Sequence, residues 1–116
     1  MRKVNIGTNF VTEVVAMDDK EFNANHHYVV KGVNGDERVF AEIHLQKGPV
    51  RENGINGCHH EDLIEIAIDR LQSFQDSEWA CRENAIAISK LEEALMWLDK
   101  RTQQRMSKGI EGTSQK

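Results

Sequence analysis

The first half of the chain alternates apolar and polar residues with the period of two that is typical of β-strands. Asn34 and Gly35 separate two such stretches, and Asn-Gly is a strong signal for a type I′ hairpin turn. With this turn, the expected cross-strand pairs are Val33–Asp36, Val30–Val39 and Tyr28–Ala41. An earlier apolar run over residues 10–15 predicts a further strand.

This register also predicts which residues share a face of the sheet. One face would carry mainly apolar side chains, those of Tyr28, Val30, Val39, Ala41, Ile43 and Leu45. The other would carry mainly polar ones, with two apolar residues among them: Lys31, Arg38, Glu42 and His44, with Val29 and Phe40. Such alternation is typical of an antiparallel sheet that is covered on one side. Residues 1–48 are therefore expected to form a small antiparallel β-sheet, followed by a glycine-rich loop over 49–58.

After this loop the apolar period changes to that of an α-helix. The first helix is expected to begin near His59 or His60, with acidic residues in its first turn, and the apolar face is Leu63, Ile64, Ala67, Ile68, Leu71 and Phe74. A connection over 75–78, with Asp76 or Ser77 as N-cap, leads to a second helix from about Trp79 to Met106. Gly109 is suited to end it. The fold class is α+β: a single domain with a helical hairpin over 59–108 and a tail over 109–116.

The two predicted helices differ in length. The second would extend roughly 42 Å, about twice the first, at 1.5 Å per residue. Its last turns must then extend beyond its partner with Leu98, Thr102 and Met106 on them. A second copy of the chain is the simplest way to cover this extension.

Charge is distributed unevenly along the chain. The net charge is −4, but residues 100–116 contain five basic residues and one acidic residue. That segment therefore carries a charge of +4, and residues 1–99 carry −8. An acidic body argues against general binding of DNA, and a local cationic end suits a compact anion. No apolar run has the length of a membrane span, and the N-terminal residues lack the apolar core of a signal peptide, so a cytoplasmic location is expected.

Candidate metal and catalytic residues form no recognisable constellation. Neighbouring histidines such as His26 and His27 point to opposite sides of a strand, so a shared ion is not expected. Cys58 and Cys81 lack the spacing of a zinc site or a redox pair, and free thiols are expected. We therefore expect no metal, no cofactor and no enzymatic activity.

The tail and the loop end of the hairpin each allow two interpretations. Gly109 to Thr113, after Arg101 and Arg105, suits either a phosphate site or a helix C-cap with basic residues placed for the helix dipole. Near the loop, Phe74 and Asn84 could stack and hydrogen-bond a purine, or could be a core and a surface residue. These residue types alone do not choose between the alternatives.

A combination of motifs resembles one protein family. The motifs are Glu52-Asn53-Gly54-Ile55-Asn56-Gly57, Phe74-Gln75-Asp76, Asn84, Arg101-Thr102 with Arg105, and Gly109-Ile110-Glu111-Gly112-Thr113. Over residues 47–113 the chain resembles phage Thoeris anti-defence proteins, whose helical hairpin is shared with anti-CBASS sponges. The resemblance implies a non-enzymatic protein of the infected bacterial cytoplasm. Such a protein binds and sequesters a cyclic nucleotide signal, glycocyclic ADP-ribose, without degrading it.

The resemblance also implies an assembly and its pockets. It implies a homodimer, with a trimer-of-dimers hexamer and a second pocket for cyclic trinucleotides in some members. On one helix, Asn84 and Arg101 lie about 25 Å apart, so one ligand can contact both only if two hairpins pack antiparallel. Our hypothesis is that Phe74 stacks on adenine, Asn84 bonds the ligand edge and Arg101 pairs with the diphosphate. Arg51 is a weaker phosphate ligand, and the second pocket uses Arg105, Gly112 and Thr113. The alternative function is a protein-binding phage accessory module with no nucleotide ligand.

Overall fold

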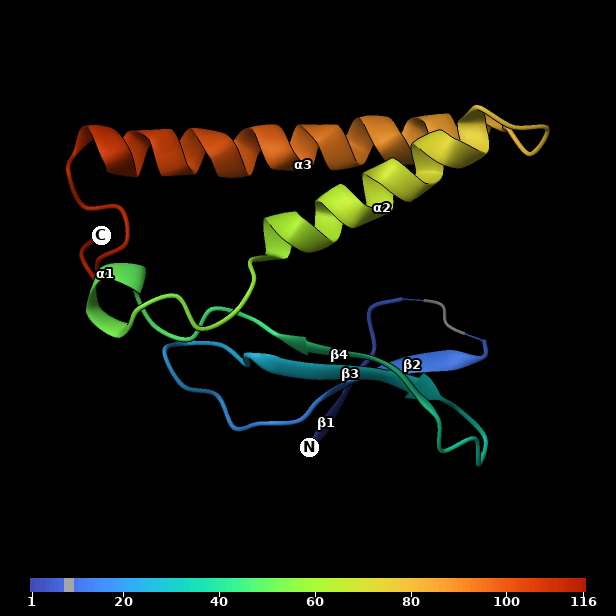
Figure 1. The fold of residues 1–116 in the computed structure, drawn as a ribbon, viewed down its shortest axis with the longest axis horizontal. Coiled ribbons are helices and arrows are strands. Elements are labelled where there is room, and N and C mark those ends of the chain that lie inside the picture. The colour runs from blue at the N-terminus through green and yellow to red at the C-terminus, as the bar shows by residue number, and fades with distance from the viewer. Residues whose placement is uncertain (8–9) are drawn as a thin grey trace. The chain divides into compact units, whose positions relative to one another are not determined.

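The computed structural model describes residues 1–7 and 10–116, which form two compact units, residues 1–58 and 59–116 (Figure 1). The first unit contains a β-sheet and the second contains a helical hairpin. This is the predicted α+β class, and the boundary between the units lies at the predicted end of the loop.

Four antiparallel strands form the sheet in the order of the chain, β1-β2-β3-β4. They are β1 (Arg2–Val4), β2 (Thr12–Ala16), β3 (His27–Gly32) and β4 (Val39–His44). The apolar run over 10–15 therefore does lead into a strand. Val15 and Val29 pair across β2 and β3, and with Ala16 they are the buried apolar residues of the described chain.

The turn between β3 and β4 has the predicted form. Asn34 and Gly35 have φ angles of 57° and 87°, and the Asp36 N–H donates to the carbonyl of Val33 over 3.1 Å. Two consecutive positive φ angles characterise the type I′ turn. The signal in the Asn-Gly dipeptide is confirmed.

Beyond this turn the predicted register is wrong. The Gly32 N–H donates to the carbonyl of Arg38, and the strands then pair Lys31 with Val39, Val30 with Ala41 and Tyr28 with Ile43. Two residues of the second strand, Glu37 and Phe40, are therefore additional, as in β-bulges. At the first bulge, the Asp36 carboxylate accepts the backbone N–H of Arg38 over 3.0 Å. Such a local side-chain bond competes with the regular ladder.

The shift of register changes the faces of the sheet. Val39 lies opposite Lys31, on the face where polar residues were expected. Val29 was also placed among polar residues, yet only 7% of it is exposed. The predicted face is therefore wrong for Val39, whereas Val29 lies on the predicted face and is buried there.

The glycine-rich segment after β4 contains a single helical turn, α1 (Val50–Asn53), which corrects the prediction of a loop throughout 49–58. Pro49 precedes the turn with φ −61°, and its carbonyl accepts the side-chain amide of Asn53 over 3.1 Å. The Gln46 side chain donates to the carbonyls of Gly48 and Gly54, on either side of the turn.

Helix α2 (His60–Gln75) begins where predicted, and helix α3 (Arg82–Ser107) begins three residues later than predicted. At the start of α2, the Asp62 carboxylate accepts the His59 N–H over 2.8 Å, as part of a capping box. The N-cap of α3 is Cys81, neither Asp76 nor Ser77. The Gln75 side chain accounts for this difference, because it bonds both the N–H and the carbonyl of Cys81, at 2.9 and 3.0 Å.

The end of α3 confirms the predicted role of Gly109. Its φ is 70°, its N–H donates to Met106, and the N–H of Ile110 donates to the carbonyl of Arg105. These two bonds form a Schellman motif, in which glycine adopts a left-handed conformation at little cost. The C-cap interpretation of the tail is therefore correct for its first residues.

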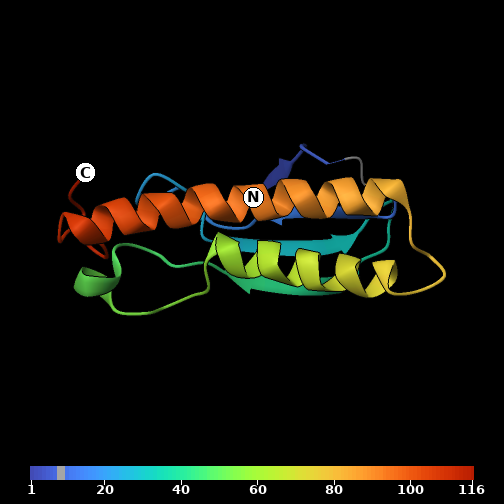
Figure 2. The ribbon, with the colours of Figure 1, turned by 90° about the horizontal axis from the view of Figure 1, so that it is seen from above.

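The two helices run side by side, and α3 extends well beyond the start of α2 (Figures 1 and 2). Their predicted apolar positions are at most half-buried, and neither helix has a buried residue. On α3, Met96, Trp97 and Met106 are 58%, 56% and 56% exposed. None of the helices in the described ranges 1–7 and 10–116 is long and apolar enough to cross a membrane.

Candidate functional site

An open groove lies at the loop end of the helical hairpin. Its volume is about 540 Å³, and its walls come from α2 and the loop that follows it: Ile66, Asp69, Arg70, Ser73, Phe74, Ser77 and Trp79. The spacing of these positions on α2 places them on one helical face. One side of a single helix therefore builds most of the groove.

The centre of this groove is an aromatic ring beside a cation. The guanidinium carbon of Arg70 lies 5.3 Å from the centre of the Phe74 ring. Residues four apart are neighbours on a helix, and this distance allows a cation–π interaction. Phe74 is 39% exposed. The pair offers an aromatic surface for a planar base and a positive charge for an anionic group.

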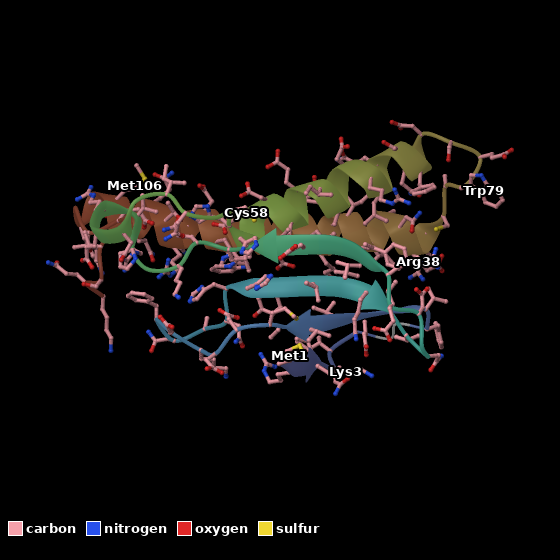
Figure 3. The ribbon with its side chains drawn as sticks, turned by 60° about the horizontal axis from the view of Figure 1, so that its bottom comes forward. Met1, Lys3, Arg38, Cys58, Trp79 and Met106 are labelled. Atoms are coloured by element: carbon pink, nitrogen blue, oxygen red, sulfur yellow. The ribbon has the colours of Figure 1, made fainter. Side chains whose placement is uncertain are left out.

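The loop after α2 positions a second aromatic residue. The Ser77 hydroxyl donates to the carbonyl of Phe74 over 2.6 Å and accepts the N–H of Trp79 over 3.1 Å. Trp79 is 70% exposed and lies at the tip of the loop, with Met106 near the far end of α3 (Figure 3). Two exposed aromatic side chains therefore flank the same opening.

The predicted ligand-binding residues lie in different parts of the chain. Phe74 lines the groove, whereas the half-buried Asn84 lies in the first turn of α3, outside the lining. Arg101 is exposed on the part of α3 that extends beyond α2, about 25 Å from Asn84 at 1.5 Å per residue. Arg51 is exposed on α1, in the other compact unit. Within a single hairpin, Phe74 and Arg101 do not meet.

Arg105 lies inside a network formed by the tail. Its guanidinium donates to the Glu111 carboxylate over 3.2 Å and to three carbonyls, those of Ile110, Thr113 and Gln115. Its side chain is only 15% exposed. Arg105 thus holds the tail against the end of α3. Gly112, with φ 79°, and Thr113 lie in the segment that it holds.

Arg70 and Trp79 are the site residues that the sequence interpretation missed. The Arg-x-x-x-Phe spacing from Arg70 to Phe74 is visible in the sequence, because a helix brings the two side chains together. Trp79 was assigned to the start of the second helix. Its exposure depends on the Gln75 and Ser77 bonds that shape the loop, and no sequence period indicates those bonds.

The groove offers groups that suit the binding of a ligand. Its polar groups are Asp69, Arg70 and two serines, and the Ser73 hydroxyl is bonded to the carbonyl of Asp69 over 3.1 Å. Among the described residues, the one group of His, Cys, Asp and Glu side chains that could share a metal ion lies elsewhere, in the sheet. The groove itself combines aromatic stacking surfaces with a cation.

Two comparisons with known proteins identify the family of the chain. Residues 37–103, more than half of the chain, match the family model described as Acb2/Tad1, hairpin domain. The chain is also 47% identical over 121 residues to Thoeris anti-defense 1 of Bacillus phage SBSphiJ7, and the alignment covers 85% of each protein. The family match includes all of α2, the loop and α3 as far as residue 103.

Proposed function

The chain belongs to the Acb2/Tad1 hairpin family of phage Thoeris anti-defense proteins, and from this premise we propose that it binds and sequesters a cyclic nucleotide signal without degrading it. The proposed ligand is glycocyclic ADP-ribose. The site of action is the cytoplasm of the infected bacterium. Removing the free signal would leave the Thoeris effector of the host inactive.

The observation that carries this proposal is the pairing of Phe74 with Arg70 in an open groove. A nucleotide presents a flat, apolar base and an anionic phosphate, and the groove offers a complementary group for each. Stacking of a base on an aromatic ring contributes about 1–3 kcal/mol and is possible for any base, because every base has a π-face. Adenine would stack on Phe74, with Arg70 and Trp79 beside it.

The groove is incomplete in a single chain, and a homodimer would complete it. Neither helix has a buried residue, and the exposed Met96, Trp97 and Met106 provide apolar area for a partner. In an antiparallel arrangement of two hairpins, Arg101 of the partner subunit would lie near Phe74 and Asn84. Asn84 would then bond the ligand edge, while the arginine pairs with the diphosphate in a charge-assisted bond. Arg51 would be a further phosphate ligand.

The tail would form the second pocket, for cyclic trinucleotides in a trimer-of-dimers hexamer. Arg105 keeps the segment from Gly109 to Gln115 folded against α3. In this proposal Arg105 acts mainly by ordering the tail. Gly112 would then present its backbone N–H to an anionic ligand. Thr113, whose N–H and hydroxyl both donate to the carbonyl of Ile110, would hold the turn beside it.

Calorimetry with the purified full chain tests the proposal. Titration with glycocyclic ADP-ribose should give a saturable signal with one ligand per pocket, hence two per dimer. ADP-ribose, the linear compound of similar charge, is the control and should bind at least tenfold more weakly. If no cyclic nucleotide produces heat, the alternative of a protein-binding accessory module with no nucleotide ligand replaces this proposal.

A further inference from the structure

Two histidines face each other across the sheet, far along the chain from the helical groove. His27 of β3 and His44 of β4 are direct partners in the register. Their rings stack with centres 4.4 Å apart and planes inclined by 15°. The shifted register creates this pairing, because in the register expected from the turn His27 would lie opposite Glu42.

A carboxylate joins this pair on the same face. Glu42 precedes His44 by two residues on β4, so the two side chains share a side of the strand. The Oε1 atom of Glu42 lies 2.8 Å from Nε2 of His27 and 3.5 Å from Nε2 of His44. Two imidazole nitrogens and a carboxylate oxygen thus converge on one point.

The spacing of these atoms suits a transition-metal ion. All three lie within 4.8 Å of one another. A tetrahedral zinc ion with bonds of about 2.1 Å separates its ligand atoms by about 3.4 Å. The distances of 2.8 and 3.5 Å lie on either side of this value. Rotation of the partly exposed side chains would bring the three atoms to bonding distance.

The backbone that carries His27 is held firmly, and space is available beside both rings. The Asp18 carboxylate accepts the backbone N–H groups of His26 and His27 over 3.1 to 3.3 Å. A pocket of about 320 Å³ borders the two histidines, and its lining also includes Lys47 and Asn56. A water molecule in this pocket could serve as a fourth ligand.

We propose that His27, Glu42 and His44 bind a divalent ion of the zinc class, with water in the fourth position. Imidazole nitrogens favour zinc, cobalt and nickel over magnesium and calcium. Because a metal ion lies in the plane of each imidazole that binds it, the two stacked rings must turn apart when the ion enters. Their side chains are 30% and 61% exposed, so this rotation leaves the buried valines undisturbed.

Equilibrium dialysis of the untagged, metal-free full chain against Zn²⁺ and Co²⁺ tests this site. We expect one ion per chain and, with Co²⁺, the visible absorption bands of a four-coordinate ion. His44→Ala should lower the affinity at least tenfold and abolish those bands. His44 is exposed, so this substitution should leave the Tm of the metal-free protein unchanged, while Zn²⁺ should raise the Tm of the wild type but not that of His44→Ala.

A second histidine beside a carboxylate provides a matched control. His60 lies 3.0 Å from the Glu61 carboxylate at the start of α2, and the side chain is 66% exposed. His60→Ala should retain the affinity and the Co²⁺ spectrum of the wild type. The proposal is overturned if His44→Ala binds the metal as tightly as the wild type. Equal losses in both variants, or no binding by the wild type, would also overturn it.

Discussion

The guanidinium of Arg70 lies 5.3 Å from the centre of the Phe74 ring, one helical turn further along α2. A second pair of the same kind occurs in the sheet, where Arg38 lies 5.1 Å from the centre of the Phe40 ring. The two pairs share their chemistry, but Phe74 also lines the groove. Substituting each phenylalanine in turn therefore distinguishes the effect on ligand affinity of losing any exposed aromatic ring from the effect of losing the ring in the groove.

Phe74→Ala should weaken the binding of glycocyclic ADP-ribose about fivefold to 150-fold, because it removes roughly 1–3 kcal/mol of base stacking. Phe40, which is 54% exposed in the sheet, is the matched control, and Phe40→Ala should bind as the wild type does. Calorimetry of both variants measures the difference. Equal affinities in the two variants would contradict the assignment of the groove as the ligand site.

Arg101→Ala should lower the affinity for the same ligand at least tenfold while leaving the dimer intact. A charge-assisted bond contributes about 1.5–3 kcal/mol, and Arg101 lies on the exposed end of α3. Lys100→Ala is the control, since the Lys100 ammonium lies 5.0 Å from the Trp97 ring centre and neighbouring residues point in different directions. Sedimentation of each variant shows whether the dimer still forms. Unchanged affinity in Arg101→Ala would show that the shared pocket is wrongly assigned.

Arg105→Ala should release the tail from α3. The folded tail should lose about 2 kcal/mol of stability, because four acceptors lose a largely buried cationic donor. Hydrogen exchange would then accelerate at the amides of Thr113 and Gln115, which are bonded within the tail. Lys108→Ala, at the C-cap of α3, should leave these rates unchanged. Slow exchange in Arg105→Ala would mean that other contacts hold the tail.

The Asp36 carboxyl gives the β3–β4 turn a pH-dependent contribution to stability. The hydrogen bond from the Arg38 side chain, followed by that from its backbone N–H, lowers the pKa of Asp36 below its ordinary 3.8. A carboxyl whose pKa is depressed in the folded state stabilises the fold above its unfolded pKa, and this contribution is lost as the pH falls through the folded pKa. The loss is therefore expected below pH 3.8.

An NMR titration of the Asp36 side-chain carbon measures this pKa directly. In Arg38→Ala the guanidinium is absent, so the pKa of Asp36 should rise toward 3.8. An unchanged midpoint in that variant would show that Arg38 is not the cause of the shift.

The sequence predicted the elements better than it predicted their pairing. The Asn34-Gly35 turn, the start of α2 and the glycine that ends α3 each follow from local chemistry that short motifs record. The register of β3 and β4 does not follow from a short motif. It is shifted because the Asp36 carboxylate accepts the Arg38 N–H and the segment after the turn accommodates two additional residues. The shifted register brings His27 opposite His44, a pairing that the comparison of adjacent histidines alone did not predict.

The candidate groove was predictable only in part. Phe74 was identified, and its partner Arg70 could have been found from the helical spacing of four. Trp79 could not have been found in this way. The Gln75 side chain delays the start of α3 through its bonds to Cys81, and this leaves Trp79 in the loop. The roles of Asn84 and Arg101 stay predictions, since they depend on a second copy of the chain.

Recovery of the bound ligand tests the central claim of sequestration most directly. Purified protein is incubated with glycocyclic ADP-ribose, separated from free ligand and then heated, and the released compound is identified by mass spectrometry. We expect the released compound to be intact glycocyclic ADP-ribose, in an amount that matches the number of pockets, and to activate the Thoeris effector again. Release of a cleaved product in place of the intact ring would contradict the account and would identify the protein as an enzyme.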